Sequence, residues 1–222
     1  RPVSVADRYI NTVRELGIEN DGKGLDVHIP DEILFGISGR VARLRLNRFE
    51  RVLGLCPGAR HFTKRWLPER FAEVGAQFAG RHDGVVLLFG GEEDRVMNAE
   101  IARSIADAAG SDRVVDWTGQ LSLLETAAAM EYCDAMVTND TGLMHIAVAM
   151  QRKIVAVFGS TVKEFGFFPL ARDAAVLERQ GLACRPCSHI GRSECPEEHF
   201  RCMREIGVEE VLGAVSDALG RE

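Results

Sequence analysis

Short apolar runs and amphipathic stretches follow one another along this chain from about residue 51 onward. The apolar runs, which have the length of buried strands, are 52–56, 85–89, 114–115, 135–137, 154–158 and 176–177. Between and after them, apolar residues recur at helical spacing in 68–78, 94–109, 121–130, 141–150 and 209–219. Because the strands are apolar on both faces, they are typical of a parallel sheet covered on both sides. The pattern predicts a Rossmann-like, three-layer α/β domain with a parallel sheet.

The first part of the chain has a different pattern. Apolar residues at helical spacing predict a helix over 3–16, and residues 17–32 are rich in Gly, Asp and Pro, as loops are. Residues 40–49 interleave four arginines with apolar side chains, which indicates either a solvated basic face or a surface for an acidic partner or anionic lipid. We interpret residues 1–48 as a linker or remnant of another domain, and residues 49–222 as the α/β domain.

The loops after the predicted strands carry most of the candidate chemistry, because the carboxyl ends of parallel strands meet at one edge. The first loop, residues 57–66, offers the hydroxyl of Thr63 and the cation of Lys64, which together suit a diphosphate. In the second loop, Glu92 could accept hydrogen bonds from sugar hydroxyls, or could simply complement a helix dipole. In the third loop, Leu121 could line a pocket for a base.

The stretch 133–149 begins as a strand, breaks at the polar residues 138–142 and continues as a helix. Asp140 or Thr141 can cap that helix. The free N–H groups and the dipole at such a helix start favour an anionic group such as phosphate. An ordinary capped helix after a strand would show the same pattern, so this stretch alone leaves both interpretations open.

Composition excludes several functional classes. The formal net charge of −6 over 222 residues argues against a general nucleic-acid-binding protein. Apolar runs stay far below the roughly 20 residues that cross a membrane. Neither the Gly-x4-Gly-Lys-Ser/Thr loop nor the Gly-x-Gly-x-x-Gly fingerprint follows a strand, which disfavours a P-loop enzyme and an NAD-dependent dehydrogenase. The sequence opens at Arg1 rather than Met, and we expect it to lack an N-terminal portion.

Five motifs together resemble a known family. They are Cys56-Pro-Gly-Ala59, Lys64-Arg-Trp66, Thr138-Asn-Asp-Thr-Gly-Leu-Met-His145, Phe158-Gly-Ser-Thr161 and Cys184-x2-Cys187…Cys195…Cys202-Met203. The set is similar to the ADP-heptose:lipopolysaccharide heptosyltransferases of glycosyltransferase family 9, most of all to the heptosyltransferase II type. The resemblance runs from about residue 51 to 220. It implies the C-terminal, nucleotide-sugar-binding half of a GT-B glycosyltransferase, whose two Rossmann-like domains enclose the active site.

The resemblance implies that eight residues bind the donor: Thr63, Lys64, Glu92, Leu121, Asp140, Thr141, Gly142 and His145. Within that set Lys64 would bind phosphate with Thr63 beside it, Glu92 would hold the ribose, and Leu121 would pack near the adenine.

The remaining implied roles fall on the stretch 138–145. Asp140 would reach the heptose, Thr141 and Gly142 would give backbone donors to the diphosphate, and His145 would lie near the sugar or the phosphates. His145 could instead be a core histidine bonded to a backbone carbonyl. No catalytic residue is assigned to this chain, since the family's base is an aspartate of the N-terminal domain.

The activity that the resemblance implies is transfer of heptose from ADP-L-glycero-D-manno-heptose to the lipopolysaccharide inner core, with inversion and without a required metal. The acceptor would be held by the other domain, so this chain alone would be inactive. The expected location is cytoplasmic, with peripheral association at the inner membrane. A non-catalytic nucleotide-binding module and a GT-B sugar-nucleotide epimerase are the alternatives.

Four late cysteines could form a metal site. Cys184 and Cys187 make a knuckle, and Cys195 and Cys202 follow at irregular spacing. Four thiolates could hold zinc tetrahedrally, but reduced thiols and disulfides are also compatible with the spacing. The resemblance implies this cysteine pattern without a required metal, so a structural zinc is possible but not favoured.

Overall fold

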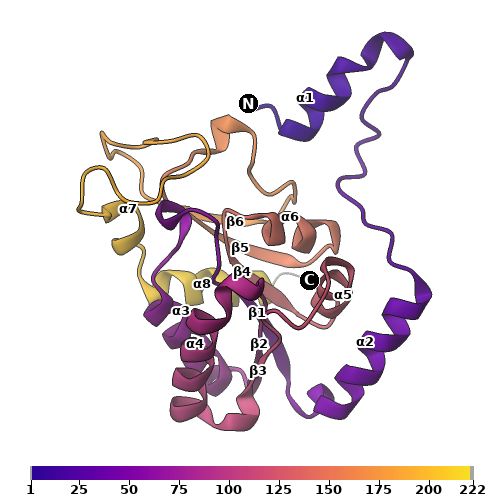
Figure 1. Cartoon of the computed structure of the whole chain (residues 1–222), viewed down its shortest axis with the longest axis vertical. Helices are drawn as coiled ribbons and strands as arrows, with labels where there is room; N and C mark the ends of the chain where they lie inside the picture. The colour runs from indigo at the N-terminus through magenta and orange to yellow at the C-terminus, as the bar shows by residue number, and fades with distance from the viewer. Residues whose placement is uncertain (1, 221–222) are drawn as a thin grey trace.

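Six parallel strands form one sheet at the centre of the protein, in a computed structural model that describes residues 2–220 (Figure 1). Their bounds are β1 Arg51–Cys56, β2 Gly84–Leu88, β3 Val114–Asp116, β4 Ala135–Asn139, β5 Lys153–Phe158 and β6 Ala175–Glu178. The strand order is β3-β2-β1-β4-β5-β6, and all five neighbouring pairs are parallel. In such a sheet, the chain reverses its direction of winding between β1 and β4, and ligands bind outside the carboxyl ends there.

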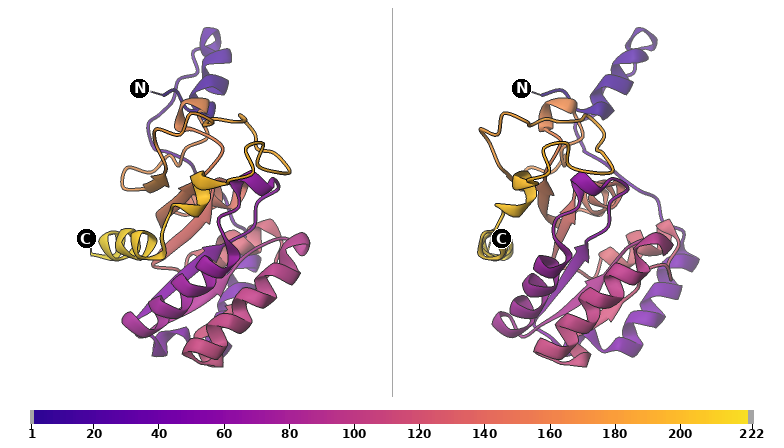
Figure 2. Two further views of the ribbon diagram at one scale, coloured as in Figure 1. Left: turned by 90° about the vertical axis from the view of Figure 1, so that its left-hand side faces the viewer. Right: turned by 60° about the vertical axis from the view of Figure 1, so that its left-hand side comes forward.

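Helices cover both faces of the sheet, as Figure 2 shows from two further sides. One face packs against α3 Pro68–Arg81, α4 Arg95–Ala109, α7 Arg201–Arg204 and α8 Val208–Leu219. The other packs against α2 Asp31–Leu44, α5 Leu123–Met130 and α6 Gly142–Ala149. Single-turn 3₁₀ helices lie at Arg14–Leu16, Leu46–Arg48, Phe62–Lys64, Glu92–Asp94, Ser111–Arg113 and Lys163–Phe165.

The strand residues explain why two layers of helices are needed. In β2, Val85 and Leu87 point into the core on the α5 side, while Val86 and Leu88 point into the core on the α3 side. All four side chains are fully buried. A strand that is apolar at every position must bury both faces, and the predicted three-layer fold with a parallel sheet is confirmed.

The predicted strands and the helices after residue 51 occur where the hydrophobic pattern placed them, to within three residues. The start of α5 is fixed by Ser122, whose hydroxyl accepts the N–H of Glu125 while the Glu125 carboxylate accepts the N–H of Ser122. The residue that caps α6 is Thr141 rather than Asp140, and its side chain makes no capping hydrogen bond.

Helix α2 lies within residues 1–48, for which the sequence predicts a linker, so the interpretation of all these residues as a linker is wrong. Ile37 and Val41 of α2 are buried in the same core cluster as residues of the sheet. Two arginines of the basic stretch 40–49 contact the rest of the protein. The Arg40 guanidinium lies 5.5 Å from the centre of the Trp117 ring, and Arg48 pairs with Asp112 at 3.0 Å. The division of the chain at residue 48 remains a prediction, and its outer limits, residues 1 and 222, lie outside the described residues.

The first helix, α1 Val5–Thr12, lies apart from the sheet at the end of an extended segment (Figure 1). None of its residues is buried, and it touches the rest of the protein near Gly166, whose carbonyl accepts the N–H of Val5 at 3.0 Å. No helix within residues 2–220 has the length and apolar character that crossing a membrane requires.

Candidate functional site

A hollow of about 390 Å³ lies at the carboxyl edge of the sheet, where the loops after β1, β2 and β4 meet. Its wall is formed by residues of these loops, of the loop after β3, and of α5 and α6: Gly58, Ala59, Arg60, Gly90, Gly91, Glu93, Asp94, Leu121, Leu123, Thr126, Thr141, Gly142, Leu143 and Ile146. Its volume is within the range of about 300–1,000 Å³ found for small-molecule sites. The position matches the reversal point of the sheet, where the fold favours ligand binding.

A second hollow of about 420 Å³ lies at the opposite edge, where Lys153 begins β5. We assign the functional site to the carboxyl edge for two reasons. Glycines there allow a ligand to approach the backbone, and the start of α6 points N–H groups toward the hollow.

Three of the predicted donor-binding residues line the carboxyl-edge hollow. Leu121 supplies an apolar wall, and Thr141 and Gly142 form the start of α6. The hydroxyl oxygen of Thr141 is buried without a hydrogen-bond partner. A buried polar atom without a partner is unfavourable, so this hydroxyl is available for a ligand.

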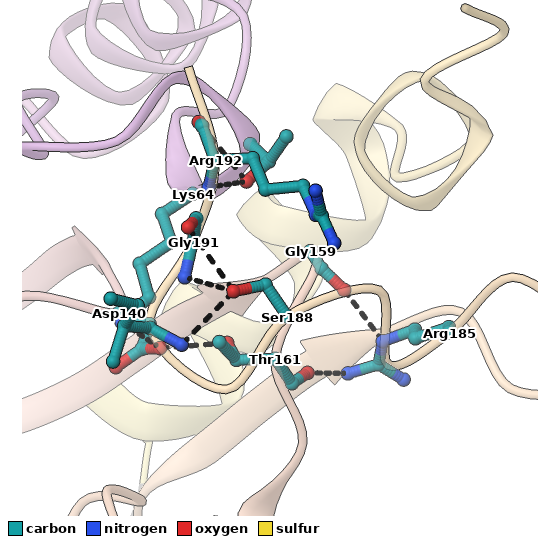
Figure 3. Close-up of polar contacts among 10 residues, drawn as sticks. Lys64, Asp140, Gly159, Thr161, Arg185, Ser188, Gly191 and Arg192 are labelled. Carbon is teal, nitrogen blue, oxygen red and sulfur yellow. Dashed lines mark hydrogen bonds and ion pairs between the residues drawn. The ribbon is translucent and has the colours of Figure 1, made fainter. Parts of the chain in front are cut away.

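Lys64 and Asp140 form an ion pair beside the hollow. Lys64 Nζ lies 2.7 Å from Asp140 Oδ2, and the two side chains are 15% and 3% exposed. The hydroxyl of Thr161 donates to the same carboxylate oxygen at 2.7 Å. Figure 3 shows the three side chains converging. The pair places one cation, largely shielded from water, beside the start of α6.

His145 lies one helical turn after the start of α6, where the charges of Lys64 and Asp140 both act on its imidazole. Burial lowers the pKa of His145 below its ordinary value of 6.5; Asp140 opposes this shift and Lys64 reinforces it. A lowered pKa keeps the imidazole neutral near pH 7. The side chain is half-buried at the site, rather than fully enclosed in the core.

Two predicted residues have partners within the protein instead of facing the hollow. The Thr63 hydroxyl accepts the N–H of Arg192 at 2.8 Å, and its side chain is buried. Glu92 is exposed and pairs with Arg95 at 2.7 Å, and Arg95 also donates to the carbonyl of Gly119 at 3.0 Å. Thr63 therefore supports the loop that carries Lys64, and Glu92 lies outside the wall of the hollow.

Asp94 is a wall residue to which the sequence gave no specific role. Its carboxylate accepts the N–H of Gly91 at 3.1 Å, and a side chain at Gly58 would overlap it. Burial raises the pKa of Asp94. This acid therefore packs the first loop against the second, and a side chain at position 58 would force the Asp94 carboxylate to move.

Asn139, the last residue of β4, is a second contributor that the sequence did not reveal. Its Oδ1 accepts the N–H of Trp66 at 2.9 Å, and its Nδ2 donates to the carbonyl of Pro57 at 2.6 Å. All three residues are buried. Asn139 thus ties both ends of the loop that carries Lys64 to the end of β4, directly before Asp140.

The four late cysteines lie together around a hollow of only about 10 Å³, with His199 among them. All four are free thiols, and Cys184 Sγ lies 3.8 Å from His199 Nε2. Burial and the neighbouring thiols raise the pKa of Cys202 to about 11. Within residues 2–220, no group of three or more His, Cys, Asp or Glu side chains has an arrangement that could hold a metal ion.

Comparison with known proteins shows the family to which this chain belongs. Residues 21–198 match Glycosyltransferase family 9 (heptosyltransferase). The chain is 31% identical over 178 residues to lipooligosaccharide heptosyltransferase 2 of Campylobacter jejuni, covering 79% of this chain and 53% of that protein. It spans about half the length of the curated relatives that it matches.

Two solved structures share the fold. A glycosyl transferase family 9 protein from Veillonella parvula is 26% identical, with a TM-score of 0.82 over 100% of this chain and 61% of that chain. The E. coli ADP-heptose lps heptosyltransferase II is 24% identical, with a TM-score of 0.70 over 87% of this chain and 53% of that chain. This chain therefore aligns with 61% of the Veillonella parvula structure and with 53% of the E. coli structure.

Proposed function

This chain belongs to glycosyltransferase family 9, and we propose that it is the donor-binding part of a heptosyltransferase that uses ADP-L-glycero-D-manno-heptose. The observation that carries the proposal is the position of Lys64. Its ammonium group lies beside the start of α6, at the edge of a hollow large enough for a nucleoside. A cation and a helix start on one side of a hollow form a binding site for a nucleotide diphosphate.

The proposed arrangement of the donor follows from the wall of the hollow. The adenosine lies between Leu121 and the glycines after β2, and the diphosphate lies at Thr141 and Gly142. The unpartnered hydroxyl of Thr141 donates to a phosphate oxygen. The heptose then extends past the start of α6 toward Asp140 and His145.

In the proposed reaction, the acceptor hydroxyl attacks the anomeric carbon and ADP leaves with inversion. The residues of this chain stabilise the negative charge that develops on ADP, through Lys64 and the N–H groups at the start of α6. We propose no metal or cofactor for this step. We propose that the base that takes the acceptor proton lies in a part of the enzyme beyond this chain, and that the same part binds the lipopolysaccharide core that supplies the acceptor. This chain by itself is therefore expected to bind the donor without transferring the sugar.

The proposed location is the cytoplasmic face of the inner membrane, with peripheral association. Arg43 and Arg45 lie exposed at the end of α2, where they can face anionic lipid headgroups.

Calorimetric titration of the chain with ADP tests the proposal. We expect saturable binding, and we expect Lys64→Ala to lose about 1–3 kcal/mol of binding free energy, as for loss of a charge-assisted contact. Lys23→Ala, at a lysine whose side chain is 85% exposed, is the matched control and should bind ADP like the unaltered protein. Absence of ADP binding, or equal affinity in Lys64→Ala, would overturn the proposal.

A further inference from the structure

Arg185 makes polar contacts with the segment after β5, and its side chain is only 6% exposed. Its guanidinium donates to the carbonyl of Gly159 at 2.6 Å, to the carbonyl of Thr161 at 2.7 Å and to the carbonyl of Arg179 at 3.1 Å. It also pairs with Glu178, whose side chain is 13% exposed. A planar guanidinium with fixed donor directions can hold several acceptors in one geometry, which a lysine cannot do.

Two of these carbonyls flank Ser160, in the segment that follows β5. From this segment, the Thr161 hydroxyl donates to Asp140, which holds Lys64 Nζ (Figure 3). Arg185 is therefore connected to Lys64 through Thr161 and Asp140, while it lies outside the wall of the nucleotide hollow.

A second connection runs through the backbone next to Lys64. The N–H of Ser160 donates to the carbonyl of Thr63 at 3.3 Å, and a side chain at Gly159 would overlap that same carbonyl. The segment fixed by Arg185 therefore packs directly against the residue before Lys64.

The loop that bears Arg185 also contacts the Lys64 loop at a later residue, Arg192. The N–H of Arg192 donates to the Thr63 hydroxyl at 2.8 Å, and the Thr63 N–H donates to the Arg192 carbonyl at 3.2 Å. At the end of this loop, the rings of Phe200 and Phe62 stack 4.8 Å apart. The loop of residues 179–200, which we call the cysteine loop, thus contacts the Lys64 loop at Phe62 and Thr63, neither of which lines the hollow.

We infer that Arg185 is a positioning residue, which fixes Lys64 for the diphosphate through Thr161 and Asp140 and through the backbone of Thr63. The inference rests on the proposed function, because it assigns Arg185 a role at the proposed donor site. It goes beyond that function by making the cysteine loop a determinant of donor affinity.

The test is a double-mutant cycle read by ADP calorimetry. Arg185→Gln should raise the ADP dissociation constant at least about three-fold, and Arg185→Lys should raise it less. In the Lys64→Ala background, Arg185→Gln should change the constant less than about two-fold, because the side chain through which it acts is gone. Equal effects of Arg185→Gln in both backgrounds would overturn the inference.

The matched control is Arg152, which donates to the carbonyls of Met150, Glu131 and Cys133. These carbonyls lie away from the carboxyl edge, so Arg152→Gln should lower thermal stability and leave ADP affinity unchanged. A loss of affinity in Arg152→Gln equal to that in Arg185→Gln would show a general loss of stability and overturn the inference. Thr161→Val, which removes only the hydroxyl contact to Asp140, should also weaken ADP binding, and unchanged binding would contradict the Asp140 route.

A second readout needs no nucleotide. In the free protein, Arg185→Gln should speed amide hydrogen exchange in residues 159–161 and also in residues 62–65, whereas Arg152→Gln should leave both segments unchanged. Failure of the unaltered chain to bind ADP would overturn the proposed function. Unchanged exchange in residues 62–65 would overturn the positioning role by itself, so the two failures are distinguishable.

Discussion

Lys64 Nζ and Asp140 Oδ2 are 2.7 Å apart, although Lys64 follows β1 and Asp140 follows β4. These two strands are neighbours at the centre of the sheet, where the winding of the chain reverses. The ion pair therefore joins the two loops that the fold brings to the ligand-binding edge. Thr161, after β5, donates to the same carboxylate and adds a third loop to this contact.

Removing the carboxylate should cost stability. Asp140→Ala leaves Lys64 without its charge partner and Thr161 without an acceptor, and breaking a buried pair typically costs about 3–5 kcal/mol. Urea denaturation measures the change in the free energy of unfolding. Glu209→Ala is the control, since its pair with Arg81 is exposed and should contribute little. Equal effects of the two substitutions would contradict a buried, structurally important pair at the site.

Asn139 should matter more than a surface asparagine. Asn139→Ala leaves the N–H of Trp66 and the carbonyl of Pro57 without their partner in a buried region, which should cost about 2–4 kcal/mol. Denaturant unfolding of this variant, with the exposed Asn47→Ala as control, checks the prediction. A cost below about 1 kcal/mol would mean that water replaces the amide, and that Asn139 does not tie the two loops together.

Two glycines should respond in opposite ways to alanine. In Gly58→Ala the new methyl group overlaps the Asp94 carboxylate, and overpacking of this kind costs about 1–3 kcal/mol. In Gly80→Ala, within α3, no atom lies within 4 Å of the added carbon, and alanine should stabilise the helix by about 0.5–1 kcal/mol. Thermal unfolding of both variants measures the contrast. The same sign for both would contradict the close contact between the first and second loops.

Stability should depend on pH through His145. Its pKa in the folded protein lies below 6.5, so the unfolded chain binds more protons in the window between that lowered value and 6.5. The free energy of unfolding therefore falls as the pH drops through this window, and rises again toward pH 7. Denaturation at pH 7.5 and pH 5.5 should show a smaller loss for His145→Gln than for the unaltered protein. The exposed His28→Gln should behave like the unaltered protein, and parallel losses in all three would refute the assignment.

Hydrophobic patterning predicted the sheet because each buried strand can be recognised from its own short run of apolar residues. Residues 85–89 are apolar at every position, and burial on both faces follows from that alone. Helix α2 was missed although Asp31 and Glu32 after Pro30 form a recognisable helix start. Gly36 and Gly39 interrupt its apolar pattern, and the surface on which Ile37 packs is formed by residues distant in the sequence.

The site could be predicted only as far as residue type and strand ends allow. Lys64, Asp140 and Thr141 each follow a strand, so the parallel sheet brings them together. The partners of Thr63 and Asp140 could not be predicted, because the Arg192 backbone and the Thr161 hydroxyl come from loops whose paths depend on tertiary packing. The contacts of Arg185 could not be predicted either, because its acceptors are backbone carbonyls, which every residue type has.

A crystal structure of this chain grown or soaked with ADP is the decisive measurement for the proposed donor site. We expect the diphosphate at Thr141 and Gly142 within hydrogen-bond distance of Lys64 Nζ, and the adenine against Leu121. ADP bound at the opposite edge of the sheet, in the hollow near Lys153, would contradict this expectation, as would a diphosphate without contact to Lys64.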